Sequence, residues 1–150
     1  MAMTQQEQAA QISDAFELFD DWEDRYQVLI DLGRKLPPMD VADKTEESRV
    51  RGCQSNVWMV ARVHPGANGA EDLIEFVADS DAAITKGLVS ILWRIYSGQP
   101  ADKILAFDID GFLERLGLNQ HLSMTRRNGL YSMVQRVKTL AASLRPSSRP

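Results

Sequence analysis

The sequence predicts an α+β fold in which helices flank a small antiparallel β-sheet. Residues 57–63 and 73–78 are rich in β-branched and aromatic side chains, and turn-forming residues separate them, which is typical of a β-hairpin. Before and after this hairpin, apolar residues recur at the three- and four-residue spacing of amphipathic helices. The order is therefore a helix, a long loop, the hairpin and four helices, which defines the class. A third strand beside the hairpin stays open.

The first helix is expected over residues 13–35, where apolar side chains form one stripe. Asp20 or Asp21 can cap it. It ends before the segment 36–38 (LPP), because the residue before a proline disfavours the helical conformation. Residues 39–56 show no period and are expected to form a long loop.

The helix expected over residues 81–97 has an aliphatic stripe and should be the central one. The segment 79–81 (DSD) is expected to cap it, and Gly98 to end it.

Three further helices complete the prediction. Pro100 opens a short one. Asp108 or Asp110 caps a second, which ends at Gly117, and Ser123 caps the last.

Length and composition define the class of protein. The chain has 150 residues, of which 44% are hydrophobic and 25% charged, as in an ordinary globular domain. We expect one domain over residues 1–145 and a disordered tail over residues 146–150. The single cysteine excludes an internal disulfide and a multi-cysteine metal site.

The N-terminus has neither a secretory nor a transit pattern, and no apolar stretch approaches the ~20 residues that span a bilayer. We therefore expect a cytoplasmic protein without a membrane partner. The net charge of −4 does not suit a nucleic-acid binder. Residues 1–42 hold nine acidic and three basic side chains, whereas residues 120–150 hold six basic and no acidic ones. This asymmetry indicates either a basic surface for an acidic partner or terminal segments that neutralise each other.

Cys53 is the first candidate for chemistry. It lies in the predicted long loop, between Gly52 and the polar residues 54–56, with Arg49 and Arg51 nearby. A cysteine in the core would lie on an apolar stripe, and neighbouring cations favour the reactive thiolate. The alternative, a small buried filler, stays open.

Two other chemistries draw less support from the sequence. A cysteine hydrolase requires a base beside the thiol, for which only His64 and His121 are available. The two Asp-x-Asp pairs, 79/81 and 108/110, lie at predicted helix starts, where capping explains them better than metal binding. The calcium-loop pattern fails at Asn119, where a glutamate is required. We expect no metal site.

Several blocks in order along the chain carry a family resemblance. They are residues 26–33 (YQVLIDLG) with Leu36-Pro37, 50–58 (VRGCQSNVW), 78–88 (ADSDAAITKGL), Phe107-Asp108, Leu116, 120–123 (QHLS), Arg126 and Gly129-Leu130. In these blocks the chain resembles the SufE family of sulfur-acceptor proteins, which includes the CsdE branch. The resemblance covers residues 15–144 and implies the fold of IscU-type scaffolds.

The resemblance also implies a function. Family members accept sulfur as a persulfide from a pyridoxal-phosphate cysteine desulfurase of the SufS or CsdA type, and they stimulate that enzyme. They pass the sulfur to an iron–sulfur scaffold. The acceptor cysteine falls on Cys53. The chain itself would be no enzyme and would need no cofactor, because the pyridoxal phosphate belongs to the partner. Rival interpretations are an iron–sulfur scaffold and an interaction domain with an inert thiol.

Five further residues are candidates for positioning the loop or binding the partner. Arg51, Gly52 and Gln54 adjoin the thiol, and Asp81 and Arg126 match family positions near the active loop. The alternative for the last two is a helix cap and a surface charge. The segment 64–72 is longer than in compact family members, and the basic tail lies outside the motifs, so partner choice stays open.

Overall fold

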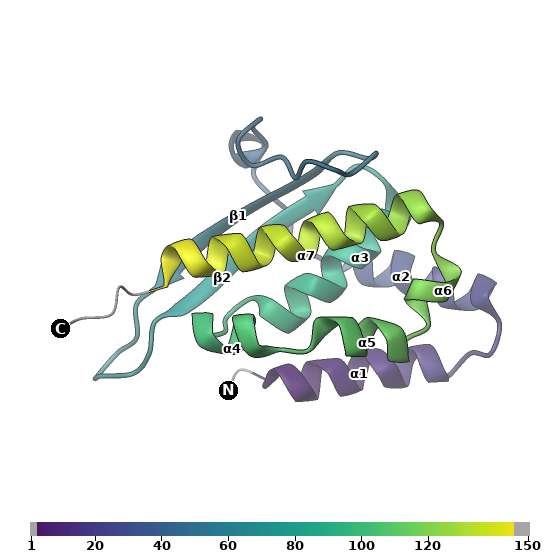
Figure 1. Ribbon diagram of the computed structural model, residues 1–150, viewed down its shortest axis with the longest axis horizontal. Coiled ribbons are helices and arrows are strands. Elements are labelled where there is room, and N and C mark those ends of the chain that lie inside the picture. Colours follow the sequence, from purple (N-terminus) through teal and green to yellow (C-terminus); the bar gives the residue numbers. More distant parts are fainter. Residues whose placement is uncertain (1–2, 146–150) are drawn as a thin grey trace.

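The computed structural model describes residues 3–145, which form an α+β fold as predicted (Figure 1). Its elements are α1 (Gln5–Glu17), α2 (Trp22–Arg34), the 3₁₀ turn η1 (Val41–Asp43), β1 (Val57–His64), β2 (Leu73–Ser80), α3 (Ala83–Tyr96), α4 (Ala101–Ala106), α5 (Ile109–Arg115), α6 (Leu118–His121) and α7 (Met124–Leu144).

The sheet is the predicted antiparallel hairpin, with Val57 opposite Ser80 and His64 opposite Leu73. No third strand forms among the described residues. Instead, isolated bridges extend both edges: Arg49 pairs with Trp58 beside β1, and Ile74 pairs with Gln99 beside β2.

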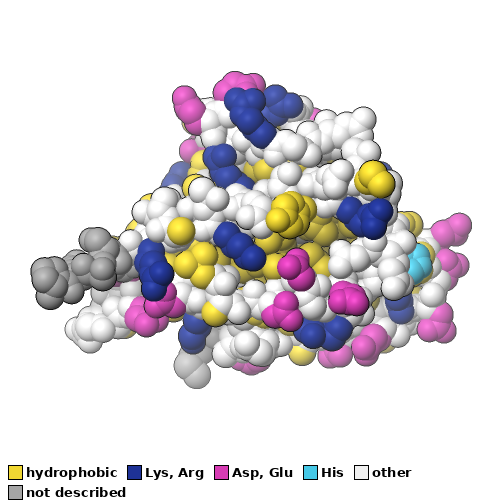
Figure 2. Space-filling model, viewed as in Figure 1, with side chains coloured by type: hydrophobic (Ala, Val, Ile, Leu, Met, Phe, Trp, Pro, Cys, Tyr) yellow, Lys and Arg dark blue, Asp and Glu magenta, His cyan; other side chains and the backbone are white. Residues whose placement is uncertain are grey.

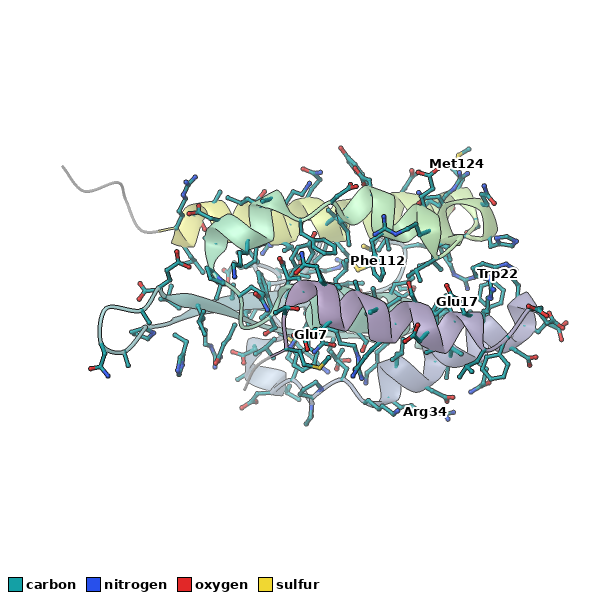
Figure 3. The ribbon with its side chains drawn as sticks, turned by 90° about the horizontal axis from the view of Figure 1, so that it is seen from below. Glu7, Glu17, Trp22, Arg34, Phe112 and Met124 are labelled. Carbon is teal, nitrogen blue, oxygen red and sulfur yellow. The ribbon has the colours of Figure 1, made fainter. Side chains whose placement is uncertain are left out.

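Helix α3 is the centre of the molecule, as its aliphatic stripe predicts. It packs against the sheet, α1, α2 and α7, and nine of its residues are buried. Helix α2 crosses it closely at Gly87, where an added Cβ would lie 2.2 Å from the Leu29 carbonyl oxygen. Seen from below, α1 runs along the front with α7 and α2 on opposite sides (Figure 3). Helix α7 therefore covers one face of the core and α2 the other.

The prediction of a single helix over residues 13–35 is wrong, because two helices, α1 and α2, occupy this part of the chain. Helix α1 begins eight residues earlier, because Thr4 and Glu7 form a reciprocal capping box. The chain leaves the helix at Leu18, and Asp21 accepts a hydrogen bond from the Glu23 N–H to start α2. Each helix therefore has its own N-cap, and Asp21, one of the two predicted caps, is the cap of α2.

The helices after β2 largely follow the prediction. Pro100, Asp108 and Ser123 stand at the N-caps of α4, α5 and α7, and α6 is an additional short helix. The predicted cap of α3 is wrong, because its N-cap is Ala82, which has no capping side chain. The predicted capping residues Asp79 and Asp81 instead bind lysine and asparagine side chains.

The acidic and basic ends of the chain do not neutralise each other. Within residues 3–145, no ion pair joins 3–42 to 120–145, and Arg145 pairs instead with Asp102 of α4 at 2.9 Å. Figure 2 shows basic side chains spread over the face that α7 covers, with acidic ones along the lower edge, at the right side and at the top. The predicted tail, 146–150, lies outside the described residues. No described helix is long and apolar enough to cross a membrane.

Candidate functional site

Cys53 lies in a short polar turn, residues 51–56, which we call the thiol loop. The turn is closed at its base by two backbone hydrogen bonds, from Val50 N–H to the Val57 carbonyl (2.7 Å) and from Met59 N–H to the Ser48 carbonyl (2.8 Å). The predicted long loop 39–56 thus contains a bridged segment that fixes the approach to the cysteine.

Gly52 sets the path of the thiol loop. Its φ of +92° lies in the region that favours glycine, and a Cβ there would come within 2.3 Å of the Ser132 hydroxyl oxygen of α7. Only a residue without a side chain brings the loop this close to the helix. The loop therefore rests on α7 immediately beside the cysteine.

The Cys53 sulfur is half-buried against α7. Sγ lies 3.4 Å from the Gly129 carbonyl oxygen, to which the thiol donates a hydrogen bond. Burial raises the pKa of the Cys53 thiol, and the charge of Arg49 opposes that rise only in part. In this position the sulfur is held as the protonated thiol rather than the reactive thiolate.

A cavity of about 100 Å³ adjoins the sulfur. Its walls come from the thiol loop, α3 and α7: Cys53, Gln54, Ser55, Thr85, Leu88, Thr125, Arg126, Gly129 and Met133. Larger clefts elsewhere on the molecule do not contact the cysteine. The cavity walls contain both apolar and hydrogen-bonding groups.

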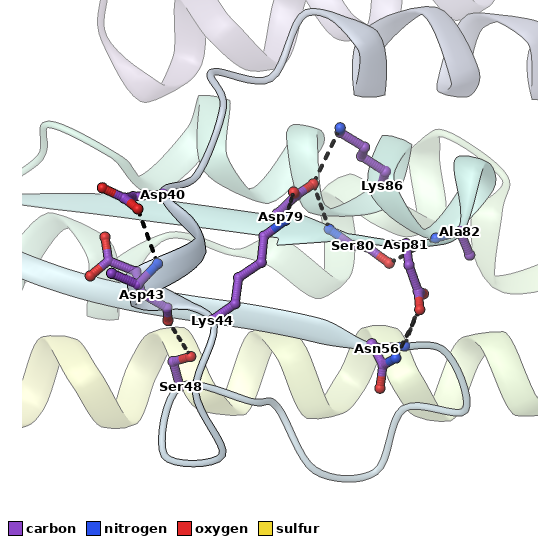
Figure 4. A network of polar contacts seen from close by, with 11 residues as sticks. Asp40, Asp43, Lys44, Ser48, Asn56, Asp79, Ser80, Asp81, Ala82 and Lys86 are labelled. Carbon is purple, nitrogen blue, oxygen red and sulfur yellow. Dashed lines mark hydrogen bonds and ion pairs between the residues drawn. The ribbon is translucent and has the colours of Figure 1, made fainter.

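Asp81 holds the downstream end of the thiol loop (Figure 4). Its carboxylate accepts hydrogen bonds from the Asn56 N–H (3.1 Å) and from the Asn56 side-chain amide (2.8 Å). The Asp81 N–H donates in turn to the Asn56 carbonyl at 3.3 Å. Asp81 is therefore a loop anchor and not the helix cap that its position indicates.

Asp79 anchors the segment that leads to the thiol loop, through a contact with Lys44. Its carboxylate pairs with Lys44 (2.8 Å) and with Lys86 of α3 (3.2 Å), as Figure 4 shows. Burial raises the pKa of Asp79, but hydrogen bonds from both lysines and from the Ser80 N–H outweigh burial and hold the pKa below its usual value. Lys44 also lies over the ring of Trp58, 5.1 Å from its centroid. The segment leading to the cysteine is thus tied to β2 and α3.

The other predicted site residues differ in their surroundings. Gln54 and Arg126 line the cavity beside Cys53. Arg51 points to solvent, 81% exposed, and lies 3.9 Å from Glu46. Sequence reasoning missed three contacts of the loop, namely Thr85, Gly129 and Ser132. Thr85 and Gly129 both stand in matching blocks, whereas nothing in the sequence distinguishes Ser132.

Neither histidine lies beside the thiol. His64 is at the far end of β1, 3.6 Å from Glu75. His121 stacks on Trp22 with ring centroids 3.9 Å apart, and its Nδ1 lies 3.0 Å from the Gly117 carbonyl oxygen. His121 therefore braces the turn between α5 and α7, and the cysteine lacks the neighbouring base that a hydrolase requires.

The carboxylate pairs do not assemble a metal centre. No group of three or more His, Cys, Asp or Glu side chains that could hold a metal ion occurs among residues 3–145. Asp108 caps α5 by accepting a hydrogen bond from the Gly111 N–H at 3.1 Å, as predicted.

The fold and the site together define an α+β domain that presents one thiol on an anchored surface turn. Comparison with known proteins supplies the family. The family model described as "SufE: Fe-S metabolism associated domain" matches residues 10–141, and the chain belongs to this family.

Related proteins agree with this family assignment, and a solved structure agrees with the fold. An uncharacterised SufE-like protein of Rhizobium meliloti (strain 1021) is 42% identical over 137 residues, which cover 91% of this chain and 96% of the relative. A second uncharacterised SufE-like protein, from Rhizobium etli, is 44% identical over 128 residues, 85% of each chain. The solution structure of a hypothetical protein from Thermus thermophilus superposes with a TM-score of 0.71 over 91% of this chain and 94% of that one. At 22% identity it supports the fold alone.

Proposed function

We propose that the protein is a sulfur carrier that accepts persulfide sulfur on Cys53 from a pyridoxal-phosphate cysteine desulfurase of the SufS or CsdA type. It stimulates that enzyme by removing its persulfide and passes the sulfur to an iron–sulfur assembly scaffold. The observation that carries the proposal is the position of Cys53. The single thiol of a SufE-family chain lies on a surface turn beside a cavity.

The transfer is a thiol exchange. The Cys53 thiolate attacks the outer sulfur of the donor's persulfide, so that a new S–S bond forms while the donor's S–S bond breaks. The electron pair of the broken bond leaves on the donor's cysteine sulfur, and no external oxidant or reductant is consumed. Such an exchange needs access to the sulfur and a thiolate, but no histidine beside the cysteine. The absence of a histidine beside Cys53 is compatible with this chemistry.

The resting position of the loop suits a carrier between transfers. Because the half-buried thiol is hydrogen-bonded to the Gly129 carbonyl, the sulfur is shielded from oxidants. Transfer then requires the thiol loop to leave α7 so that the sulfur enters the donor's site. The proposal places this exchange in the cytoplasm, where thiols stay reduced.

The rival functions draw less support. A cluster scaffold would have to obtain most of its ligands from another chain, because this chain has one cysteine. An interaction domain with an inert thiol gives no reason for a cavity beside the sulfur.

The test is an intact-mass measurement. The protein is incubated with L-cysteine and a purified, active SufS-type desulfurase without reductant. We expect a mass gain of one or more sulfur atoms, absent in Cys53→Ser, and faster desulfurase turnover with the wild-type chain. An unchanged mass in the presence of an active cognate desulfurase would refute the proposal.

A further inference from the structure

A cleft of about 470 Å³ lies between the N-terminal end of α1 and the corner where α3 leads into α4. We call it the α1–α4 cleft, and Figure 1 shows the start of α1 next to α4. It shares no residue with the cavity beside Cys53. Sites for small molecules typically have volumes of about 300–1,000 Å³. The cleft therefore has room for a ligand of its own.

A buried amide in the wall of this cleft has no partner in the fold. Gln5 of α1 is 5% exposed and lines the cleft, and within residues 3–145 its Nε2 forms no hydrogen bond. A buried N–H group without an acceptor costs stability, and a leucine would fill the same position without that cost. The last torsion of a glutamine has a broad range, so the amide can turn its N–H groups towards a ligand while α1 stays in place. Gln5 therefore points to a ligand that accepts a hydrogen bond.

The first turn of α1 adds backbone donors to the same wall. Helix α1 has 13 residues, and the N–H groups of a first turn have no acceptor within the helix. The Thr4 hydroxyl accepts from the Glu7 N–H at 3.1 Å, but the N–H groups of Gln5 and Gln6 donate to no described residue. The acid of this turn, Glu7, is bonded to the Thr4 N–H and does not line the cleft. Free N–H groups at the positive end of a helix dipole favour an anion.

The charge of the cleft has the matching sign. Among the described residues that line it, Lys103 of α4 is the only charged one, and it forms no ion pair within residues 3–145. The adjacent acid, Asp102, is engaged with Arg145 at 2.9 Å. Leu73 and Phe107 give the cleft apolar walls. This lining suits an anionic group joined to an apolar body.

We propose that the α1–α4 cleft binds a small organic anion with a phosphate or carboxylate group. That group accepts hydrogen bonds from Gln5 and the first turn of α1 and pairs with Lys103, while the apolar part of the ligand lies against Leu73 and Phe107. The binding is noncovalent and does not involve Cys53, so it goes beyond the proposed function. Because the cleft exists only in the folded chain, such a ligand stabilises the fold.

The test is a titration of the isotope-labelled full chain, followed through the NMR shifts of its amide groups. The ligands are phenyl phosphate and benzoate, which share a ring and distinguish a phosphate from a carboxylate. Benzyl alcohol has the ring without the charge and is the control. For at least one anion we expect shifts at Gln5, Gln6 and Lys103 with a dissociation constant of about 1 mM or lower, and we expect none for benzyl alcohol.

Two variants separate binding from folding. Lys103→Gln removes the charge at an exposed position, so we expect about tenfold weaker binding and an unchanged melting temperature of the free chain. Gln5→Leu removes the buried amide, so binding should weaken by about tenfold while the free chain melts at the same or a higher temperature. Lys35→Gln changes an exposed lysine outside the cleft and should bind as wild type does.

Three results would overturn this site. The first is an absence of shifts around the cleft with both anions at about 10 mM. The second is wild-type affinity in both Gln5→Leu and Lys103→Gln. The third is binding of benzyl alcohol as tight as that of the anions, because charge would then play no part. The mass measurement on Cys53 is independent of this titration, so failure of the proposed function is a separate result.

Discussion

The thiol loop and the hairpin tip, residues 65–72, are both polar turns joined to β1, yet they are held in different ways. The thiol loop is fixed by distant elements, through Asp81 at the start of α3 and Gly129 in α7. The hairpin tip is held by its own residues, with hydrogen bonds from Ala70 N–H to the Ala67 carbonyl and from Gly66 N–H to Asp72. Tertiary contacts, rather than local composition, therefore distinguish the thiol loop from a turn that only connects strands.

Two glycines test this difference most strongly. Both Gly52 and Gly69 have positive φ, but a Cβ at Gly52 meets Ser132, whereas a Cβ at Gly69 meets nothing within 4 Å. In Gly52→Ala we expect the thiol loop to leave α7, with iodoacetamide labelling of Cys53 about tenfold faster or more. Both variants should lose roughly 1–2 kcal/mol in the free energy of unfolding from the backbone conformation. Labelling of Gly69→Ala should equal wild type, and equal labelling of Gly52→Ala would contradict the contact with α7.

The aspartate anchors give a smaller effect. Asp81→Ala removes both side-chain hydrogen bonds to Asn56, each worth about 0.5–1.5 kcal/mol. Because Asp81 is exposed, we expect a loss near the lower figure and labelling of Cys53 about threefold faster. Asp72→Ala removes the corresponding bond in the hairpin tip and should leave labelling unchanged. Urea unfolding and labelling kinetics measure both, and faster labelling in Asp72→Ala as well would remove the distinction between the two turns.

The pH dependence gives the smallest effect. Burial raises the pKa of Cys53, so the folded chain keeps the thiol proton where the unfolded chain has lost it. The buried thiol therefore makes its full contribution to the free energy of unfolding at pH values below the pKa of the unfolded chain, about 8.5. That contribution is lost as the pH rises through the higher pKa of the folded chain. We expect the labelling midpoint of Cys53, the pH at which iodoacetamide labelling reaches half its maximum, to lie above its ordinary value in wild type and to fall towards that value in Gly52→Ala. A wild-type midpoint at or below the ordinary value would show that the sulfur is not held as described.

The same measurement has a stability control. In Cys53→Ser, the free energy of unfolding should lose less on going from neutral to alkaline pH than in wild type, because the titrating group is gone. Parallel curves for the two chains would show that the thiol contributes nothing to the pH dependence.

Local signals suffice for most of the fold. The β-branched and aromatic residues of β1 and β2, the aliphatic stripe of α3 and the Ser123 cap of α7 each predict the element that forms. The missed start of α1 is also local, since Thr4 and Glu7 have capping-box spacing. The break before α2 also has a local signal, because Asp21 is one of the two predicted caps and stands at the N-cap of α2.

The site can be predicted only in part. Cys53 is identifiable because its neighbours are polar, and Asp81 because it stands in a matching block. The partners of both residues come from segments 25 and 76 positions away along the chain. Periodicity and caps carry no information about such pairs, so the roles of Asn56, Gly129 and Ser132 require the fold. For the same reason, the sequence predicts helix caps at Asp79 and Asp81, and only the fold supplies their lysine and asparagine partners.

The two hydrogen bonds that close the base of the thiol loop also limit how far the sulfur can travel. Six residues separate the paired positions Val50 and Val57, and an extended chain spans at most about 3.3–3.6 Å per residue. Out and back, this tether lets Cys53 project only roughly 10 Å beyond its fixed ends. Under the proposed function, a partner would have to bring its own reacting sulfur within that radius, so the depth of the entrance to its active site would select which desulfurases can load Cys53.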